Sequence, residues 1–267
     1  MQRVLYILSQ QFRLPLAVTD TSHKKSPLTS CVSLWLAFFY EKFYTLCNHL
    51  FSEDLPMNAK KEYYKNLSNT VLKGFQKRFI EGYYCETKEE AKALALSLVP
   101  ENVSASFGGS VTLNETGVLE ALRNRQDLTL YDRDTANGPE EVKKIMHDAL
   151  SCDYYFMSSN AITTDGELVN IDGNGNRVAA LIYGPENVII IAGMNKIVKN
   201  VEEGISRTRN VAAPPNCIRL NKNTPCAANG VCGNCLSDTI CDQIVITRAS
   251  RVPQRIKVIL VGEELGF

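Results

Sequence analysis

Five cysteines crowd into one short segment near the end of the chain, between Cys217 and Cys241. Cys232 and Cys235 form a C-x-x-C pair inside a glycine- and asparagine-rich loop, a spacing that lets two thiolates face one ion. Cys226 and Cys241 each lie six residues outside that pair. These four thiolates predict a metal site, and Cys217 is left as the spare cysteine.

The identity of the metal stays open at this point, because thiolates suit both zinc and iron–sulfur clusters. The spacing matches neither the usual zinc-ribbon pattern nor the bacterial ferredoxin run. Two alternatives are a redox dithiol made by Cys232 and Cys235, and a set of incidental buried thiols. The chain holds nine cysteines, an odd number crowded at one end, which argues against a secreted disulfide framework. We therefore expect a reducing, cytoplasmic setting.

A second group of candidate residues follows Val103–Phe107, which is predicted to form a strand. Gly108-Gly109-Ser110 comes next and precedes a helix expected from Val111 to about Asn124. Glycine lets a ligand approach the backbone and the helix start offers free N–H groups, so this turn predicts a cradle for an anion. Thr112 lies in the first helical turn. Glu115 follows it, and its carboxylate is either a complement to the helix dipole or a general base.

The third group occupies Tyr154–Val198, where apolar strands alternate with polar loops. Asp165-Gly166 predicts a hairpin with Leu168–Ile171 as its return strand. The run Asn187–Ala192 is apolar on both faces, as expected for a central parallel strand. The loops are either plain connections or ligand contacts. The candidate contacts are polar, charged or small residues next to these strands: Asn160, Thr163, Asp165, Asp172, Gly173, Asn176, Arg177 and Lys196.

Composition narrows the range of partners. The 267 residues carry a formal net charge of +0. This balance gives no indication of a basic face, so neither nucleic acid nor an anionic membrane is expected as a partner. Residues 1–56 differ in character from the rest and receive no function here. Their apolar run Cys31–Tyr40 is too short to span a bilayer, which needs about 20 residues. We favour a translation start at Met57, with a signal or anchor segment as the alternative.

The elements that must position these groups follow a regular order. From Met57 an amphipathic helix runs to about Gly82, and Thr87 begins a capped helix that ends near Leu98. Strands then alternate with helices from Val103 onward, which predicts an α/β domain over residues 57–267 with a mostly parallel sheet. The carboxyl ends of such strands meet at one edge, so we expect Gly109 and Asn160 to share one ligand cavity.

The segments Gly108–Gly117 and Ser158–Val198 together resemble the lactate-utilisation (LUD) domain family, and the likeness extends over about Met57–Phe267. The resemblance implies a Rossmann-like sheet of the NagB/RpiA/CoA transferase-like kind, similar to ribose-5-phosphate isomerase and the CoA transferases. Some family members belong to operons for oxidising L-lactate to pyruvate, alongside iron–sulfur partner proteins. The chain lacks the cysteine repeats of the larger iron–sulfur member, and its own cysteine cluster is similar to a feature of compact members.

The resemblance implies a protein of lactate or carboxylate metabolism that binds a small anionic metabolite or a nucleotide-like cofactor. Gly108, Gly109 and Ser110 would cradle the anion, and Arg177 or Lys196 would supply positive charge. Glu115 would be the candidate base. One alternative is an isomerase or acyl-CoA transferase on the same fold, and another is a non-catalytic subunit that uses an iron–sulfur or zinc site.

Overall fold

The computed structural model describes residues 54–267. Apart from the first two residues of its first helix, all features described below belong to one compact unit, Pro56–Phe267. The hypotheses about residues 1–53, including the Cys31–Tyr40 run, lie outside the described residues. The helix expected from Met57 is α3 (Asp54–Lys77), and it ends earlier than predicted because Gly82 belongs to a strand, β1 (Glu81–Cys85).

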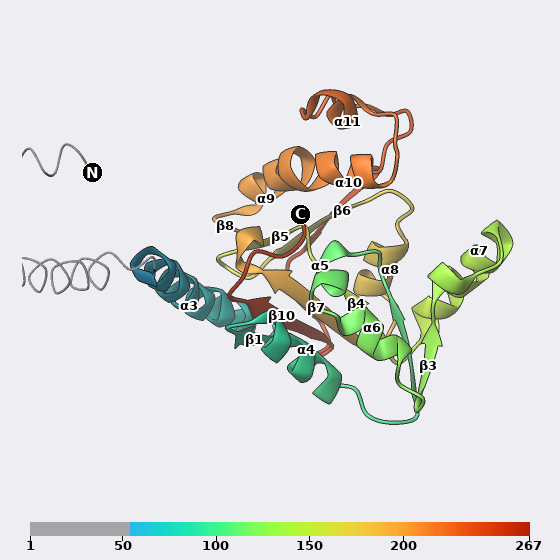
Figure 1. Ribbon diagram of the computed structural model, residues 1–267, viewed down its shortest axis with the longest axis horizontal. Coiled ribbons are helices and arrows are strands. Elements are labelled where there is room, and N and C mark those ends of the chain that lie inside the picture. The colour runs from blue at the N-terminus through green and yellow to red at the C-terminus, as the bar shows by residue number, and fades with distance from the viewer. Residues whose placement is uncertain (1–53) are drawn as a thin grey trace, which may run out of the picture. The chain divides into compact units, whose positions relative to one another are not determined.

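Six parallel strands form the main sheet in the order β1-β10-β7-β4-β2-β3 (Figure 1). The predicted α/β class with a mostly parallel sheet is thereby confirmed. Strand β7 is central, and its residues from Val188 to Gly193 are all buried, which explains why its sequence is apolar on both faces. Strand β7 spans Asn187–Gly193, and the strands not yet defined are β10 (Ile256–Val261), β4 (Tyr154–Met157), β2 (Val103–Phe107) and β3 (Leu128–Tyr131).

Each face of this sheet carries its own core, because successive side chains of a strand point to opposite faces. Phe156 and Ile189 pack with Leu113 and with the apolar residues of α4 (Lys88–Ser97) and α6 (Val118–Arg123). Tyr155 and Ile190 belong to the opposite core, which contains residues of α3 and α8 (Asn176–Ile182). Helix α4 begins as predicted, with the Thr87 side chain accepting a hydrogen bond from the Glu90 amide.

A second, four-stranded sheet has the order β8-β5-β6-β9. The predicted hairpin is present, with Gly166 at φ +90 between antiparallel strands β5 (Ala161–Thr163) and β6 (Leu168–Asp172). The return strand therefore pairs with Ala161–Thr163, which was not predicted as a strand. Strand β4 instead enters the main sheet beside β2 and β7. The remaining strands are β8 (Ile197–Val198) and β9 (Gln243–Thr247).

A run of helices follows β8 and carries the first two cysteines of the cysteine-rich segment, Cys217 and Cys226. Helix α9 (Val201–Arg207) continues through a π-helical turn (Thr208–Ala212) into α10 (Ala213–Arg219), and α11 (Pro225–Asn229) follows. Figure 1 shows these helices in orange, grouped on the side of the molecule that carries β5, β6 and β8. Within residues 54–267, no helix has both the length and the apolar character needed to cross a membrane.

Candidate functional site

A cavity of about 440 Å³ lies where the carboxyl ends of several strands face the helices around α10. Apart from Phe267, its lining has two parts, which we name separately. The strand-end wall comprises Gly109–Thr112, Arg133, Ser158–Asn160, Ile171–Asn174, Asn176, Arg177 and Lys196, which lie at the end of β6 or follow strands β2, β3, β4, β6 or β7. The cysteine-bearing wall comprises Ala212, Ala213, Asn216, Arg219, Leu220, Lys222, Thr239, Ile240 and Asp242.

Lys196 contributes a buried cation to the strand-end wall. It lies in the 3-10 turn Met194–Lys196 directly after β7, and only 4% of its surface is exposed. Its Nζ donates hydrogen bonds to Thr112 Oγ1 and Ser158 Oγ, both at 3.0 Å. None of the ion pairs among the described residues includes Lys196. Burial, helped by the nearby charges of Arg207 and Arg177 and opposed by Glu115, lowers the pKa of Lys196 to about 7.

Arg177 ties the loops of the strand-end wall together. Its two terminal nitrogens donate to Ser158 O at 3.1 Å, Asn160 Oδ1 at 3.0 Å, Asn170 Oδ1 at 2.6 Å and Ile171 O at 2.6 Å. The Nε atom lies 3.4 Å from Asp172 Oδ2. Burial lowers the pKa of this guanidinium, although it remains a cation at any physiological pH. Arg177 thus fixes the positions of residues from two different sheets.

Two polar atoms beside Arg177 have no hydrogen-bond partner among the described residues. They are Asp172 Oδ2 and Asn170 Nδ2, and both are buried. The other carboxylate oxygen of Asp172 accepts from the Gly175 amide at 3.1 Å. A buried acceptor without a partner costs about 1–3 kcal/mol, so a ligand hydroxyl that donates to Asp172 Oδ2 would recover part of that cost.

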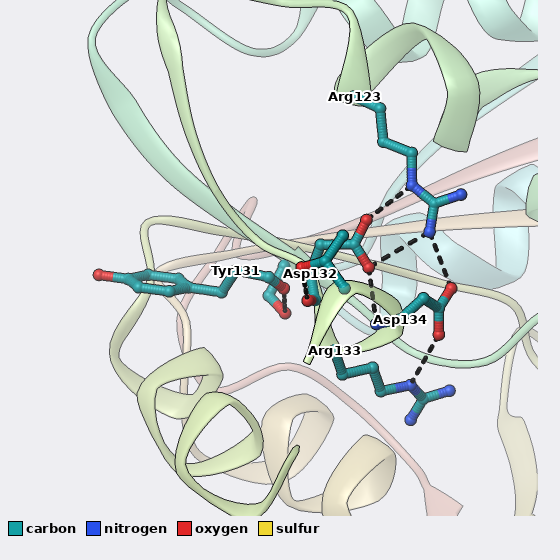
Figure 2. Close-up of polar contacts among 7 residues, drawn as sticks. Arg123, Tyr131, Asp132, Arg133 and Asp134 are labelled. Atoms are coloured by element: carbon teal, nitrogen blue, oxygen red, sulfur yellow. Dashed lines mark hydrogen bonds and ion pairs between the residues drawn. The ribbon is translucent and has the colours of Figure 1, made fainter. Parts of the chain in front are cut away.

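Arg133 is a cationic lining residue that the sequence analysis missed. It lies in the 3-10 turn Arg133–Thr135 that follows β3, and the turn is held by Arg123 of α6. Arg123 Nε donates to Asp132 Oδ2 at 2.6 Å, and its Nη2 donates to Asp134 Oδ2 at 2.8 Å (Figure 2). Arg133 itself approaches Asp134 at 3.9 Å. Its position directly after β3 was an available signal. Strand β3 is parallel to β2, and β2 leads into Gly108-Gly109-Ser110, so the residues after both strands lie at the same edge of the sheet.

The glycine turn has a packing role. A β-carbon on Gly109 would overlap the Arg133 guanidinium, and one on Gly108 would lie 2.9 Å from Arg177 Cδ. The absence of side chains therefore lets two arginines come close to the end of β2. Ser110 accepts a hydrogen bond from the Leu113 amide at 3.4 Å and so caps the short helix α5 (Val111–Glu115).

The charge of the lining is predominantly positive. Five basic side chains line the cavity, whereas Asp172 and Asp242 are its two acidic side chains. The basic residues are Arg133, Arg177, Lys196, Arg219 and Lys222. A concave surface with this excess of cations attracts and holds anions.

Comparison with known proteins gives this chain its family. The model of the LUD domain matches residues 69–261, which is more than half of the chain. The chain belongs to the LUD domain family. The predicted family is thereby confirmed. No curated protein matches the sequence.

Among solved structures, this LUD domain is similar to a DUF162 family protein from Deinococcus radiodurans. The two are 13% identical, with a TM-score of 0.42, over 75% of this chain and 98% of the other. Ribose 5 phosphate isomerase A from Neisseria gonorrhoeae is 17% identical over 43% of this chain and 54% of its own, with a TM-score of 0.29. The delta subunit of eIF2B from Chaetomium thermophilum is 16% identical over 45% and 50%, with a TM-score of 0.31.

The cavity of the LUD domain contains most of the ligand contacts expected from the sequence. The ones that line it are Gly109, Ser110, Thr112, Asn160, Asp172, Gly173, Asn176, Arg177 and Lys196. Gly109 and Asn160, which were expected to meet, therefore lie on one cavity.

Other candidate residues lie outside the lining. Thr163 donates to Glu167 Oε2 at 3.2 Å, and Asp165 pairs with Arg78 at the far end of the hairpin. Thr163 and Asp165 lie at or near the tip of the β5–β6 hairpin. The start of β5 and the end of β6 border the cavity, so the tip lies one strand length away from it. Glu115 Oε2 accepts from the Gly266 amide at 2.6 Å. Gly108 borders the lining through its contact with Arg177.

The five cysteines from Cys217 to Cys241 belong to the segment that forms the cysteine-bearing wall, although none of them lines the cavity itself. Cys217 of α10 and Cys226 of α11 are buried, with their sulfurs 3.7 Å apart, so these two thiols are in contact. Cys232 and Cys235 are half-buried, and Arg209 Nη2 donates to Cys232 Sγ at 3.3 Å. Burial, together with the thiols of Cys217, Cys226 and Cys232, raises the pKa of Cys241 to about 11. Within residues 54–267, no group of three Cys, His, Asp or Glu side chains is arranged so that it could hold a metal ion.

Proposed function

We propose that this LUD domain binds a small carboxylate metabolite in the cavity and acts in lactate or carboxylate metabolism. The observation that carries the proposal is Lys196, a buried ammonium group in the cavity wall with two hydroxyl partners and no carboxylate partner among the described ion pairs. Burying an unpaired charge is costly, and an anionic ligand would compensate it.

The shape and polarity of the cavity fit such a ligand. Its volume of about 440 Å³ falls within the range of roughly 300–1,000 Å³ that is usual for small-molecule sites. The ligand carboxylate would lie beside Lys196 and Arg133, because hydrogen bonds between a carboxylate and a cationic donor are stronger than those between neutral groups. A 2-hydroxyl group would donate to Asp172 Oδ2, which has the Arg177 ion pair at 3.4 Å but no hydrogen-bond partner among the described residues. A hydroxy acid of the size of lactate would offer a carboxylate to Lys196 and a hydroxyl to this oxygen of Asp172.

The geometry favours this role over a transferase that works through a covalent glutamyl intermediate. Such an enzyme needs a glutamate that the thioester can reach. The cavity lining contains no glutamate among the described residues, and Glu115 is engaged with the backbone of Gly266.

The test compares L-lactate and pyruvate with the uncharged lactamide, using calorimetry and thermal unfolding of the full chain. We expect the two carboxylates to raise the melting temperature, because they bind only the folded state, and lactamide to have little effect. Lys196→Met should weaken carboxylate binding by about tenfold or more, because a hydrogen bond to a charged group contributes about 1.5–3 kcal/mol.

The matched control is Lys199→Met, which removes an exposed lysine three residues further along the chain and should leave affinity unchanged. Equal binding of lactamide, or equal losses in the two variants, would contradict the proposal. Binding of a nucleotide in place of the carboxylates would assign the same positive cavity to a cofactor.

A further inference from the structure

The cysteine-bearing wall contains a pair of buried thiols that the anion-binding role does not use. Cys217 lies on α10 between the lining residues Asn216 and Arg219, and Cys226 lies on α11. Their sulfurs are 3.7 Å apart, although the two residues are separated by the turn that joins the helices. The segment that carries the other three cysteines leads directly to Thr239, Ile240 and Asp242, which also line the cavity. Cysteines are therefore sequence neighbours of the lining residues in both halves of this wall.

We propose that Cys217 and Cys226 form one edge of a single thiolate-ligated metal ion of the zinc type, and that two of the three cysteines Cys232, Cys235 and Cys241 complete it. The ion would fix the cysteine-bearing wall over the cavity. This assignment concerns the ion and its ligands and stands apart from the proposed function. Only its effect on ligand affinity rests on that function.

The distance between the two sulfurs supports a single ion. In a tetrahedral site with zinc–sulfur bonds of about 2.3 Å, neighbouring sulfurs lie about 3.8 Å apart. The Cys217–Cys226 separation of 3.7 Å matches this edge. In an iron–sulfur cluster the irons are bridged by inorganic sulfide, so cysteine sulfurs on different irons lie farther apart. The geometry therefore changes the ligand set expected from spacing alone, because Cys217 is no longer the spare thiol.

The loop that would supply the remaining ligands is already held near the pair. Asp238 accepts from Lys222 Nζ at 2.8 Å and from the Asn223 amide at 2.7 Å, and both donors follow α10. Asn234, inside the C-x-x-C turn, has φ +51 and accepts from Arg209 Nη2 at 2.6 Å. A positive φ at this position gives a tight turn, in which both flanking cysteines can face one ion.

This segment also needs a stabiliser that its apolar contacts do not provide. Ile218, Val231 and Leu236 are large apolar residues whose side chains are mostly exposed, with Leu236 at 92%. A short segment with so little apolar burial has few means to keep one conformation, and a structural metal ion supplies that stability in small domains.

The test measures metal content in the full chain, purified under reducing and anaerobic conditions. We expect one zinc ion per chain, and its loss in Cys217→Ser and in Cys226→Ser. The control Cys85→Ala, which removes a buried cysteine of β1, should keep the full zinc content. Of the three loop cysteines, two should be required when each is changed to serine in turn.

A second measurement guards against variants that fail to fold. Cobalt(II) exchanged into the wild-type chain should give the absorption of a tetrahedral thiolate site, and a chelator should expose four additional thiols to a thiol reagent. Iron with acid-labile sulfide would overturn the single-ion assignment, and full zinc in Cys217→Ser would overturn the ligand pair. Wild-type protein without metal and without cobalt binding would overturn the site. These outcomes are independent of carboxylate binding, so a failure here is distinct from a failure of the proposed function.

Discussion

The two walls of the cavity are built in different ways. The strand-end wall is attached to the six-stranded sheet, and its charged side chains are buried and hydrogen-bonded, as Arg177 and Lys196 demonstrate. The cysteine-bearing wall has exposed charged groups, and Arg219 bonds only to Asn216 of its own helix among the described contacts. The comparison teaches that the fold itself preorganises charge on one wall, whereas the charged groups of the other wall have few contacts with the rest of the domain, which is why we propose a metal ion there.

The largest expected effect is a difference between the two walls in how much one arginine contributes to the free energy of unfolding. Arg177→Met removes four hydrogen bonds and leaves the buried Asp172 carboxylate without its neighbouring cation. We expect the free energy of unfolding to fall by about 3–5 kcal/mol, as for other broken buried ion pairs. Arg219→Met, on the opposite wall, should change it by only about 0.5 kcal/mol. Urea unfolding followed by circular dichroism measures both values, and similar small losses would show that the walls do not differ in this way.

The residues of the strand-end wall were largely predictable, because each follows an apolar strand and parallel strands bring their ends together. Asn160, Asp172 and Lys196 were found by this local rule. Arg133 was missed since it depends on the pairing of β3 with β2, which no local pattern specifies. Asp165 was wrongly expected among these residues, because spacing along the chain did not reveal that β6 pairs with β5 and carries the hairpin tip away.

For the cysteine-bearing wall, the sequence predicted only the presence of clustered cysteines and not their arrangement in space. The cysteine count predicted a metal site, but the helices α10 and α11 that carry Cys217 and Cys226 were not expected. From spacing alone, Cys226 and Cys241 were chosen as ligands because each lies six residues from the C-x-x-C pair. In the structure, the turn between α10 and α11 instead brings Cys226 next to Cys217, nine residues earlier in the chain. Proximity of this kind is set by helix packing, so it required the three-dimensional structure.

A second effect, of intermediate size, is the pH dependence of ligand affinity. Because the pKa of Lys196 in the free protein is about 7, the lysine is protonated below that pH and loses its proton above it. The dissociation constant for L-lactate should stay constant below pH 7 and rise by up to about tenfold per unit above it. Calorimetry across pH 6–9 measures this slope, and Lys196→Met should bind weakly with no such slope. A slope that persists in Lys196→Met would assign the titration to another group.

The lowered pKa of Lys196 also determines whether the stability of the protein rises or falls with pH. Its pKa is lowered from 10.5 in the unfolded chain to about 7 in the folded one, so between these values the unfolded state binds more protons. Stability relative to Lys196→Met should therefore rise with pH across this window, by up to about 1.4 kcal/mol per unit, and show no lysine-dependent slope below pH 7. Urea unfolding of both proteins at pH 7 and pH 9 tests the sign. A relative loss of stability at the higher pH would contradict the assignment of Lys196 as a buried, unpaired amine.

The smallest expected effect concerns the edge of the strand-end wall, where Arg133 is positioned indirectly. Arg123→Met removes the ion pairs to Asp132 and Asp134 that hold the turn carrying Arg133 (Figure 2). Arg123 is 40% exposed, so solvent screening limits the loss of stability to about 0.5–1 kcal/mol. Carboxylate affinity should nevertheless fall several-fold, because a mobile turn costs ordering free energy on binding. The control is Arg125→Met, which breaks a comparable pair with Asp127 away from the cavity and should leave affinity unchanged. Equal affinities in the two variants would mean that Arg133 makes no contribution to the anion site, and the positive charge of this wall would then come from Lys196 and Arg177 alone.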